Sequence, residues 1–529
     1  MADLVHQLIT DSARRVPQRP ALKYRDAELD YAELSTAVMA FAAAMVALGL
    51  KRGERVAIYA EKRLETVIAM FGVSAAGGVY VPVNPLLKGE QVAYILADCN
   101  VRVLVTTADR LPVIAPALGR CPDLRAAVSM GEPRATSELA GVTIVPWSQT
   151  QSSTSVESGH RVIDQDPAAI LYTSGSTGRP KGVVLSHRNI IAGARSVAEY
   201  LELSEDDRLL SVLPLSFDYG MNQLTTMFLT GGLAVLMNHL FARDVIAMAE
   251  KEKITGLAAV PPLWIQLAQL PWPASVTEHL RYFTNSGGHM PKETLASLRG
   301  ALPKTKPYLM YGLTEAFRST YLPPSEVDRR PESMGKAIPN AEIVVVREDG
   351  ALCAPHEPGE LVHRGVLVSL GYWNDPEKTA ERFKPAPGQD RALPLMELAV
   401  WSGDTVKMDE DGFLYFVGRR DEMIKTSGYR VSPTEVEEVL YATKLVGEVA
   451  ALGVDHPVLG QAVTIIATPA DEGATLTADA LLAVCKRQLP AYMVPAHIEI
   501  IAGSLPRNPN GKIDRKLLAS ERQHLFTDA

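Results

Sequence analysis

One short stretch, residues 171–187, has the chemistry to hold an anion. It reads LYTSGSTGRPKGVVLSH and places glycines, hydroxyl side chains and Lys181 between two apolar runs. Hydroxyls and free backbone N–H groups in a glycine-rich turn form a concave nest for an anion, and a lysine adds a mobile point charge. The spacing is not that of a P-loop, because Val183 follows Lys181 and Gly182. Because Gly/Ser clusters are usually flexible linkers, a surface turn is the alternative interpretation.

Four further residues could serve a nucleotide, although each has an ordinary structural alternative. Asp404 follows an apolar strand in SGD, and a carboxylate can accept from two vicinal hydroxyls of a ribose. Glu315 in YGLTEA suits Mg²⁺, which prefers carboxylate and phosphate oxygens. Tyr311 offers an aromatic face, and Lys512 lies in the turn PNGKIDR. Taken singly, these residues are more often a turn aspartate, a solvated acid, a core tyrosine and a solubilising lysine.

Six motifs together resemble the adenylate-forming superfamily of acyl-CoA ligases, luciferases and peptide-synthetase adenylation domains. YTSGSTGRPKGV resembles the signature of that superfamily, and the other motifs follow in the same order along essentially the whole chain. They are YGLTEA (311–316), GELVHRGVLVSLGYWNDPEKT (359–379), WSGDTVKMDEDGFLYFVGRRDE (401–422), IKTSGYRVSPTEVE (424–437) and LPRNPNGKIDR (505–515).

The resemblance implies a two-step, AMP-forming acid–thiol ligase. A carboxylate attacks the α-phosphate of ATP to give acyl-AMP and pyrophosphate, and a thiol then displaces AMP to give a thioester. The attack of one anion on another needs neutralisation and positioning more than covalent help. The implied cofactors are ATP, Mg²⁺ and a thiol, which is either CoA or phosphopantetheine.

The resemblance also implies a role for each matching residue of the nucleotide site. Thr314 would contact the α-phosphate and Glu315 would bind Mg²⁺. Asp404 and Arg419 would bind the ribose, and Tyr311 the adenine. The other predicted nucleotide contacts are Thr173, Ser174, Gly175, Ser176, Thr177, Gly178 and Lys181 around the phosphates, with Gly288 and Gly312.

The small domain would supply the remaining catalytic groups. By resemblance, Lys512 enters the site and bridges the substrate carboxylate and the phosphate, where a cation stabilises the developing charge. Asp421 matches a hinge about which this domain rotates between the two steps. Lys425 and Gly428 would then face the site, and Gly428 has no Cβ to obstruct a pantetheine thiol. A simple hairpin glycine is the alternative for Gly428.

The segment PLSFDYGMNQL (214–224) gives information about which carboxylic acid the chain would bind. Asp218 is similar to the aspartate that pairs with the α-ammonium group in amino-acid adenylation domains, which would satisfy a buried carboxylate. It could instead cap the following helix. NSGGHMP (285–291) departs from the Gly-Gly-Glu of many peptide-synthetase domains, which weakens the amino-acid interpretation. The predicted pocket residues are Phe217, Asp218, Asn222, Thr284, Ser286, Met310 and Arg318; the last could bind an acidic group or neutralise Asp218.

The elements that must position these residues alternate between strand and helix patterns. Strands are predicted at 55–60, 79–85 and 101–107, with helices at 63–77 and 89–99 between them. This pattern favours an α/β chain with substantially parallel sheet. From residue 411 the pattern changes, and Ser432, Pro433 and Glu435 predict a helix start with a capping box.

Length and pattern together predict two domains. The 529 residues exceed the size of one core. We expect an adenylation core over 1–420, with several α/β subdomains, and a mobile α+β domain over 421–529 that carries Lys512.

Composition restricts the partners. The net charge of −8 argues against a general nucleic-acid surface. The sequence contains no apolar run of 18 residues, so no membrane span is predicted. Four dispersed cysteines favour reduced thiols in the cytoplasm. The expected partners are a small carboxylic acid and either free CoA or a separate carrier protein.

Three function classes remain in view. The first is the acid–thiol ligase, with an amino-acid adenylation enzyme that loads a separate carrier protein as its variant. The second is a luciferase-like oxidase, which an aromatic content of 6% does not support. The third is a non-catalytic nucleotide-binding relative, which would be expected to lack Lys512, Glu315 or Asp404, and all three are present.

Overall fold

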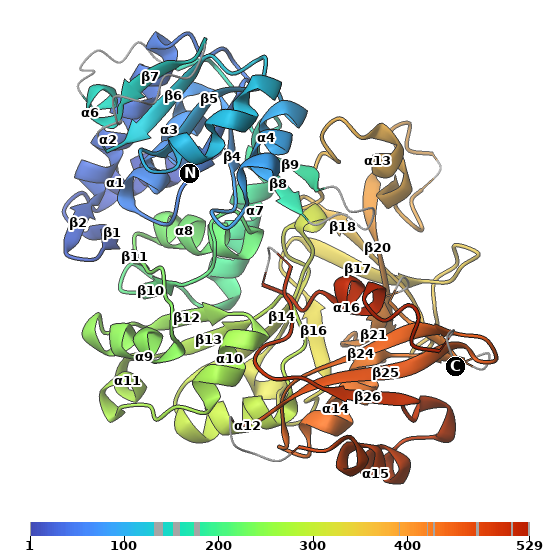
Figure 1. The fold of residues 1–529 in the computed structure, drawn as a ribbon. Helices are drawn as coiled ribbons and strands as arrows, with labels where there is room; N and C mark the ends of the chain where they lie inside the picture. Colours follow the sequence, from blue (N-terminus) through green and yellow to red (C-terminus); the bar gives the residue numbers. More distant parts are fainter. Residues whose placement is uncertain are drawn as a thin grey trace.

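The computed structural model contains three β-sheets and two lobes (Figure 1). It describes residues 2–131, 141–151, 159–173, 180–390, 392–419, 422–426, 429–471, 476–508 and 511–526. The large lobe holds two sheets with their helices, and the third sheet belongs to the small lobe at the C-terminal end of the chain. This architecture confirms the α/β fold class with a small C-terminal α+β unit.

The first sheet has the order β7-β6-β5-β3-β4-β8-β9 and is parallel except for its last strand. It confirms the predicted alternation, because β3, β4 and β5 lie at the expected positions with α3 and α4 between them. Its strands are β3 Arg55–Tyr59, β4 Val79–Pro82, β5 Val101–Thr107, β6 Ala126–Met130, β7 Thr143–Pro146, β8 Pro167–Thr173 and β9 Lys181–Ser186.

The second sheet is mixed and has 14 strands. Its order is β17-β18-β20-β21-β16-β15-β14-β13-β12-β10-β11-β1-β2, and β19 pairs with β20. The run from β11 to β14 is parallel. The strands are β1 Pro20–Tyr24, β2 Ala27–Asp30, β10 Arg208–Ser211, β11 Leu233–Leu236, β12 Gly256–Ala259, β13 Tyr282–Asn285, β14 Lys306–Tyr311, β15 Thr320–Leu322, β16 Ser333–Ala337, β17 Ala341–Val346, β18 Gly359–Gly365, β19 Phe383–Pro385, β20 Leu398–Met408 and β21 Leu414–Arg419.

The small lobe has its own five-stranded sheet and its own core around Val436, Leu440 and Ile465. The change of sheet falls between β21 and β22. The division at 420/421 stays a prediction, and Asp421 itself lies outside the described residues. The strands are β22 Ile424–Thr426, β23 Tyr429–Val431, β24 Val446–His456, β25 Gly460–Pro469 and β26 His497–Ile500.

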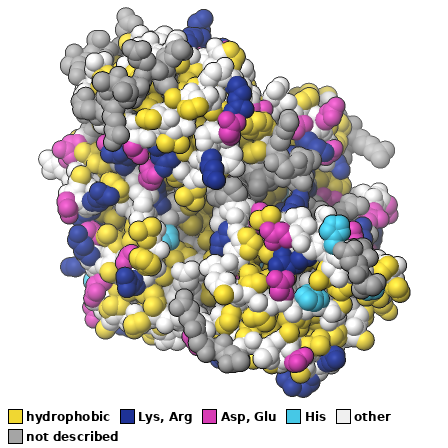
Figure 2. Space-filling model, viewed as in Figure 1, with side chains coloured by type: hydrophobic (Ala, Val, Ile, Leu, Met, Phe, Trp, Pro, Cys, Tyr) yellow, Lys and Arg dark blue, Asp and Glu magenta, His cyan; other side chains and the backbone are white. Residues whose placement is uncertain are grey.

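Helices cover the sheets, and within the described residues none is long and apolar enough to cross a membrane. On the face seen in Figure 2, acidic and basic side chains are interspersed rather than segregated by sign. The helices are α1 Gln7–Arg15, α2 Tyr31–Ala47, α3 Leu64–Ala76, α4 Gly89–Asp98, α5 Leu111–Ile114, α6 Trp147–Thr150, α7 His187–Tyr200, α8 Asp218–Thr230, α9 Ala242–Lys251, α10 Pro261–Ala268, α11 Ala274–His279, α12 Lys292–Ala301, α13 Pro376–Arg382, α14 Pro433–Tyr441, α15 Ala478–Gln488 and α16 Arg515–Ser520.

The predicted capping box of α14 is wrong. Ser432 occupies the N-cap position and Pro433 the first helical position, but the Ser432 side chain makes no capping hydrogen bond. The side chain is buried, and its Oγ lies 3.6 Å from the position that a Cβ on Gly418 would take. Packing against β21 therefore replaces the expected contact with the helix amides.

A strained turn after β14 directs the chain back into the large lobe. Phe317 has φ 56° and ψ −51°, and the N–H of Arg318 donates to the carbonyl of Ala316 at 2.6 Å. This is a γ-turn, a rare conformation for a residue with a side chain. The Phe317 ring is fully buried against Gly193 of α7, where a Cβ would overlap the ring. Burial of the ring holds the strained turn in place.

We predict that Gly193→Ala destabilises the protein by about 1–3 kcal/mol, because the added methyl group overpacks the Phe317 ring. Gly300→Ala is the matched control: Gly300 also lies in a helix, and a Cβ there meets nothing within 4 Å. The control should stabilise the protein by about 0.5–1 kcal/mol through helix propensity. Both values are measured by denaturant unfolding, and equal stability of the two variants would show that Phe317 does not need this close approach.

Candidate active site

The candidate site lies where several parallel strands end. The segment after β10 leads to Asp218, β13 leads to Ser286 and Gly287, and β14 leads to Tyr311 and Thr314. In α/β sheets, ligands bind at the carboxyl ends of the strands, because the connecting loops and helix N-termini meet there. The structure therefore brings together residues that are almost 100 positions apart in the sequence.

Asp404, Arg419 and Tyr311, which the sequence assigned to the nucleoside, lie together. Asp404 is buried in β20, and its Oδ2 accepts a hydrogen bond of 2.5 Å from the Tyr311 hydroxyl. Nε of Arg419 lies 3.5 Å from Oδ1, but Oδ1 accepts no hydrogen bond from the described residues. Burial raises the pKa of Asp404, and Arg419 opposes that shift. A buried oxygen that still needs a donor suits a ribose hydroxyl.

The phosphate loop is framed by two neighbouring strands. Thr173 ends β8 and pairs with Lys181, which begins β9, so the glycine-rich loop joins two antiparallel strands. Desolvation and the positive charge of Lys378 lower the pKa of Lys181. Five predicted phosphate contacts lie outside the described residues: Ser174, Gly175, Ser176, Thr177 and Gly178.

Glu315 is held by a partner that the sequence did not reveal. The Tyr372 hydroxyl donates to Oε1 of Glu315 at 2.6 Å, and the Lys181 Nζ lies 5.2 Å from the centre of the Tyr372 ring. Among the described residues no group of three or more His, Cys, Asp or Glu side chains could hold a metal. One carboxylate completed by substrate phosphates is the usual arrangement for Mg²⁺, and Glu315 fits it.

Lys512 reaches from the small lobe into the large one. Its Cε lies 3.9 Å from the position that a Cβ on Gly287 would take, and Cζ of Phe217 lies 3.8 Å from the same point. Gly287 has φ +82° and no side chain, so both groups can approach. The sequence interpretation did not include Gly287, although its place in NSGGH after a strand was a signal.

The turn that carries Lys512 is braced by Arg507, another residue that sequence reasoning missed. Nη1 of Arg507 donates to the carbonyl of Gly511 at 2.9 Å, and its other nitrogen pairs with Glu448 of β24. The N–H of Asn508 donates to the Lys512 carbonyl at 2.8 Å. These bonds fix the direction in which the lysine leaves the small lobe.

The environment of Lys512 favours the neutral form of its side chain. The residue keeps exposed surface, yet it lies between the two lobes. Desolvation there, together with the positive charge of Arg419, lowers the pKa of its ammonium group, while Asp218 and Asp404 oppose the shift. The lysine therefore lies close enough to two buried acids, Asp218 and Asp404, for both to stabilise its charged form.

Most of the predicted pocket residues cluster. Asp218 is buried, and its Oδ1 accepts a hydrogen bond of 3.3 Å from Thr314. Burial raises the pKa of Asp218, and Arg318 and then Lys512 oppose that shift. Nη1 of Arg318 donates to Ser286 at 3.3 Å. The predicted N-cap alternative for Asp218 is wrong, because Phe217 is the N-cap and Asp218 is the first residue of α8.

Other predicted residues have different surroundings. Asn222 is buried, but its amide donates to Thr225 within α8. Met310 accepts a hydrogen bond from Tyr200 of α7, and Thr284 bonds to Tyr219. Lys425 is exposed in β22, and its backbone N–H donates to the Gln461 side chain.

The structure describes two of the three other predicted glycines, Gly288 and Gly312. Gly312 lies where a Cβ would come within 3.2 Å of the Arg318 backbone, so a side chain there would disturb the Arg318 turn. The Gly288 carbonyl accepts a hydrogen bond of 3.1 Å from Asn285 after β13. Gly428 lies outside the described residues.

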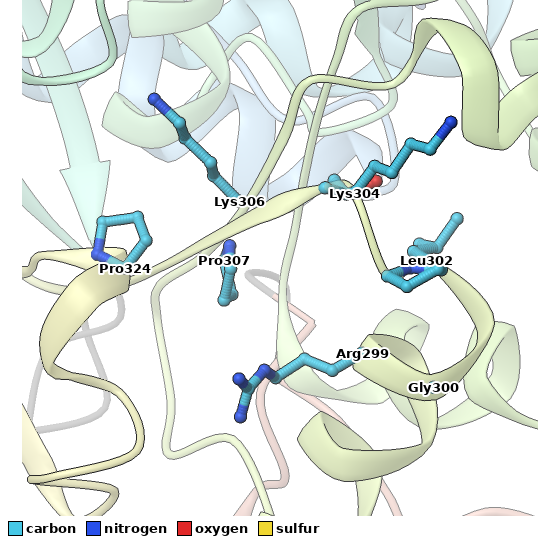
Figure 3. A pocket seen from close by; sticks show the side chains of 9 residues that line it. Arg299, Gly300, Leu302, Lys304, Lys306, Pro307 and Pro324 are labelled. Carbon is cyan, nitrogen blue, oxygen red and sulfur yellow. The ribbon is translucent and has the colours of Figure 1, made fainter.

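A surface hollow of about 440 Å³ lies at the other end of β14 (Figure 3). It is lined by Arg299, Lys304 and Lys306 among others. Arg299 is paired with Asp328 and Lys306 with Glu202. Because Lys306 begins the strand whose far end leads to Thr314, this hollow is not part of the site.

Two models of known protein families match the sequence. Residues 9–373 match the model of the AMP-binding enzyme family, and residues 435–512 match the AMP-binding enzyme C-terminal domain. The chain belongs to this family of AMP-binding enzymes.

Individual relatives fall into two groups. The chain is 30% identical to surfactin synthase subunit 2 of Bacillus subtilis over 97% of its length, but it spans only 14% of that protein. It is 31% identical to a long-chain-fatty-acid–CoA ligase of Salmonella typhimurium, with 97% and 94% of the two chains covered. The first curated relatives it matches are thus far longer than the chain.

A solved structure shares the whole fold. The o-succinylbenzoate coenzyme A synthetase (MenE) of Bacillus subtilis, in complex with ATP and magnesium ion, superposes with a TM-score of 0.81 at 25% identity. The match covers 97% of this chain and 98% of that one.

We predict that Lys512 loses its proton at a pH below the ordinary lysine value of about 10.4, because desolvation and Arg419 disfavour the ammonium form. Competitive acetylation at a series of pH values, followed by peptide mass spectrometry, measures this directly. Lys486, exposed on α15, is the internal reference in the same digest. An apparent pKa for Lys512 at or above the ordinary value would contradict the described environment.

Proposed function

We propose that this chain activates a carboxylic acid with ATP to acyl-AMP and then transfers the acyl group to a thiol. The observation that carries the proposal is the approach of Lys512 from the small lobe to Gly287, beside Asp218 and Thr314 of the large lobe. A cation delivered by the small lobe to the carboxyl ends of parallel strands, next to a carboxylate suited to a ribose, suits the attack of an acid on a nucleotide.

In the first step an oxygen of the acid forms a bond to the α-phosphorus, and the bond from that phosphorus to the bridging oxygen of pyrophosphate breaks. Lys512 stabilises negative charge on the attacking carboxylate and the α-phosphate. Thr314 orients the α-phosphate by hydrogen bonding. Thr173 and Lys181 border the loop that would hold the β- and γ-phosphates.

The nucleoside would be held by Asp404, Arg419 and Tyr311. The unsatisfied Oδ1 of Asp404 supports this assignment, because a buried acceptor without a donor is costly. Glu315, oriented by Tyr372, would hold Mg²⁺, which when bound neutralises phosphate charge.

The second step requires another arrangement of the lobes. The thiol attacks the acyl carbon, AMP leaves with the bonding electrons, and the thiol proton is released. In the present arrangement Lys425 is exposed and Lys512 occupies the site, so the structure supports the adenylation state. Rotation at Asp421 would bring Lys425 and Gly428 to the site. The thiol is CoA or the pantetheine of a carrier protein.

An amino-acid adenylation enzyme is the second candidate. Asp218 is 4% exposed, and among the described residues Thr314 is the side chain that donates to its carboxylate. A substrate ammonium group would balance that buried charge. The match to surfactin synthase subunit 2 adds support at the level of the family alone.

We predict that Lys512→Ala reduces ATP–pyrophosphate exchange roughly 100-fold or more, because the developing charge loses its cation. Thioester formation from synthetic acyl-AMP should change much less, since Lys512 is proposed to act in the first step only. Lys486→Ala is the matched control and should leave both half-reactions unchanged. Equal losses in the two half-reactions for Lys512→Ala would contradict the assigned role.

We also predict that Glu315→Gln raises the Mg²⁺ concentration needed for half-maximal exchange by at least about tenfold, because a charged ligand is removed. Tyr372→Phe, which leaves the carboxylate but removes its hydrogen bond, should cause a smaller rise. The measurement is exchange at fixed ATP over a range of Mg²⁺ concentrations. An unchanged Mg²⁺ requirement in Glu315→Gln would rule out this residue as the ligand.

A further inference from the structure

Arg318 is a buried cation whose hydrogen-bonding capacity is largely unused. Its side chain is 1% exposed, among the most deeply buried large side chains of the described residues. Nη1 donates to Ser286 Oγ at 3.3 Å, whereas Nε and Nη2 have no hydrogen-bond partner within the described part of the chain. Burying an unpaired charge is costly, so these two nitrogens require an explanation.

The two unused nitrogens lie on one edge of the guanidinium group. Nε and Nη2 point their N–H bonds in the same direction, and this edge binds both oxygens of a carboxylate in parallel. The third nitrogen, Nη1, donates to Ser286. The guanidinium group also lies over the ring of Tyr219, whose centre is 4.7 Å from the Arg318 Cζ. The arginine is thus held by its other contacts while its carboxylate-binding edge stays available.

Asp218 does not fill that edge. It is the nearby buried acid, and Arg318 helps to stabilise its charged form. Its Oδ1 instead accepts from Thr314, and the ion pairs found within 4.0 Å among the described residues do not join Asp218 to Arg318. Two opposite charges that are both buried without a direct ion pair between them are each better balanced if a charged ligand group binds to them.

The backbone is strained in order to place Arg318 there. The γ-turn at Phe317, with φ 56°, comes immediately before Arg318 and is anchored by the buried Phe317 ring. Such a residue costs roughly 1–3 kcal/mol and persists where the surrounding structure enforces it, which is common at functional sites. The strained turn and the unpaired edge are independent observations on the same side chain.

We propose that Arg318 binds a second anionic group of the acid substrate, so that the enzyme activates a dicarboxylic acid in preference to a monocarboxylic one. This inference rests on the proposed function, because it concerns the acid of the same site. The reacting carboxylate lies toward Lys512 and Thr314, and the second carboxylate lies toward Arg318 and Ser286. Asp218 would lie near both carboxylates, and its charge would select between acids with and without an ammonium group.

The test is ATP–pyrophosphate exchange with matched acids. The five-carbon set is pentanoate, glutarate, norvaline and glutamate. Comparing its members separates the effect of a second carboxylate from the effect of an amino group. Corresponding sets with four and six carbons cover neighbouring lengths. We expect the dicarboxylic member of the preferred set to exceed its monocarboxylic partner by roughly 100-fold or more in kcat/KM, because sites built for a polar group reject analogues that lack it.

Arg318→Met and Arg318→Lys test the residue. The methionine retains an apolar stem over Tyr219 and should remove the preference for the dicarboxylic acid while retaining exchange with the monocarboxylic partner. The lysine keeps the charge but not the paired edge, so it should restore only part of the preference. Arg329→Met, which removes an exposed guanidinium group, is the control and should leave the preference unchanged. Thermal unfolding of each variant checks that the fold is retained.

The outcomes separate this inference from the proposed function. Exchange that is supported equally by mono- and dicarboxylic acids, or equally reduced for both in Arg318→Met, would overturn the inference and leave the ligase activity intact. The latter result would mean that Arg318 only balances the charge of Asp218. Exchange with no acid of these sets would overturn this inference, and exchange that is also absent with longer fatty acids and aryl acids would contradict the proposed function.

Discussion

The proposed chemistry depends on a single ammonium group that must reach the large lobe without being fixed there. Lys512 gains its direction from its own domain, through Arg507 and Glu448, and meets a glycine on the other side. Two contacts that join the lobes nearby are partly exposed: the ion pair of Lys444 with Glu293 and the hydrogen-bonded contact of His289 with Glu438. Such pairs contribute about 0–1 kcal/mol each, so they can align the lobes and still release them.

The large lobe supplies the opposite property, a rigid arrangement of buried charges. Asp218, Arg318 and Asp404 are each less than one-tenth exposed and are carried by a helix start, a strained turn and a strand. Charges in such surroundings interact strongly and reorganise little, which favours substrates of matching charge. The unsatisfied atoms, Oδ1 of Asp404 and two nitrogens of Arg318, mark where ligand groups are needed.

The sequence predicted the class of fold, and it named several residues that the structure brings together at the candidate site. Strict alternation of apolar strands with helices leaves few options other than a parallel α/β sheet, and β3, β4 and β5 follow it. Predictions from short sequence patterns, such as helix capping, were less reliable where tertiary packing competes with the local preference. Ser432 begins a helix as predicted, but its hydroxyl is buried against β21 instead of capping.

The acid pocket was harder to predict because its contacts join distant segments. No local pattern indicates that Tyr372 orients Glu315 or that Gly287 admits Lys512, since 57 residues separate the first pair and the second crosses between the lobes. Whether Arg318 points inward depends on one backbone turn, which a sequence pattern does not reveal.

By itself, then, the sequence determined the residue types, their order and the family chemistry that they imply, because these are properties of short segments. Only the tertiary structure decided which of those residues meet and which buried charges remain unpaired. The physical reason is that desolvation and ion pairing depend on distances across the fold, and packing rather than local preference sets those distances.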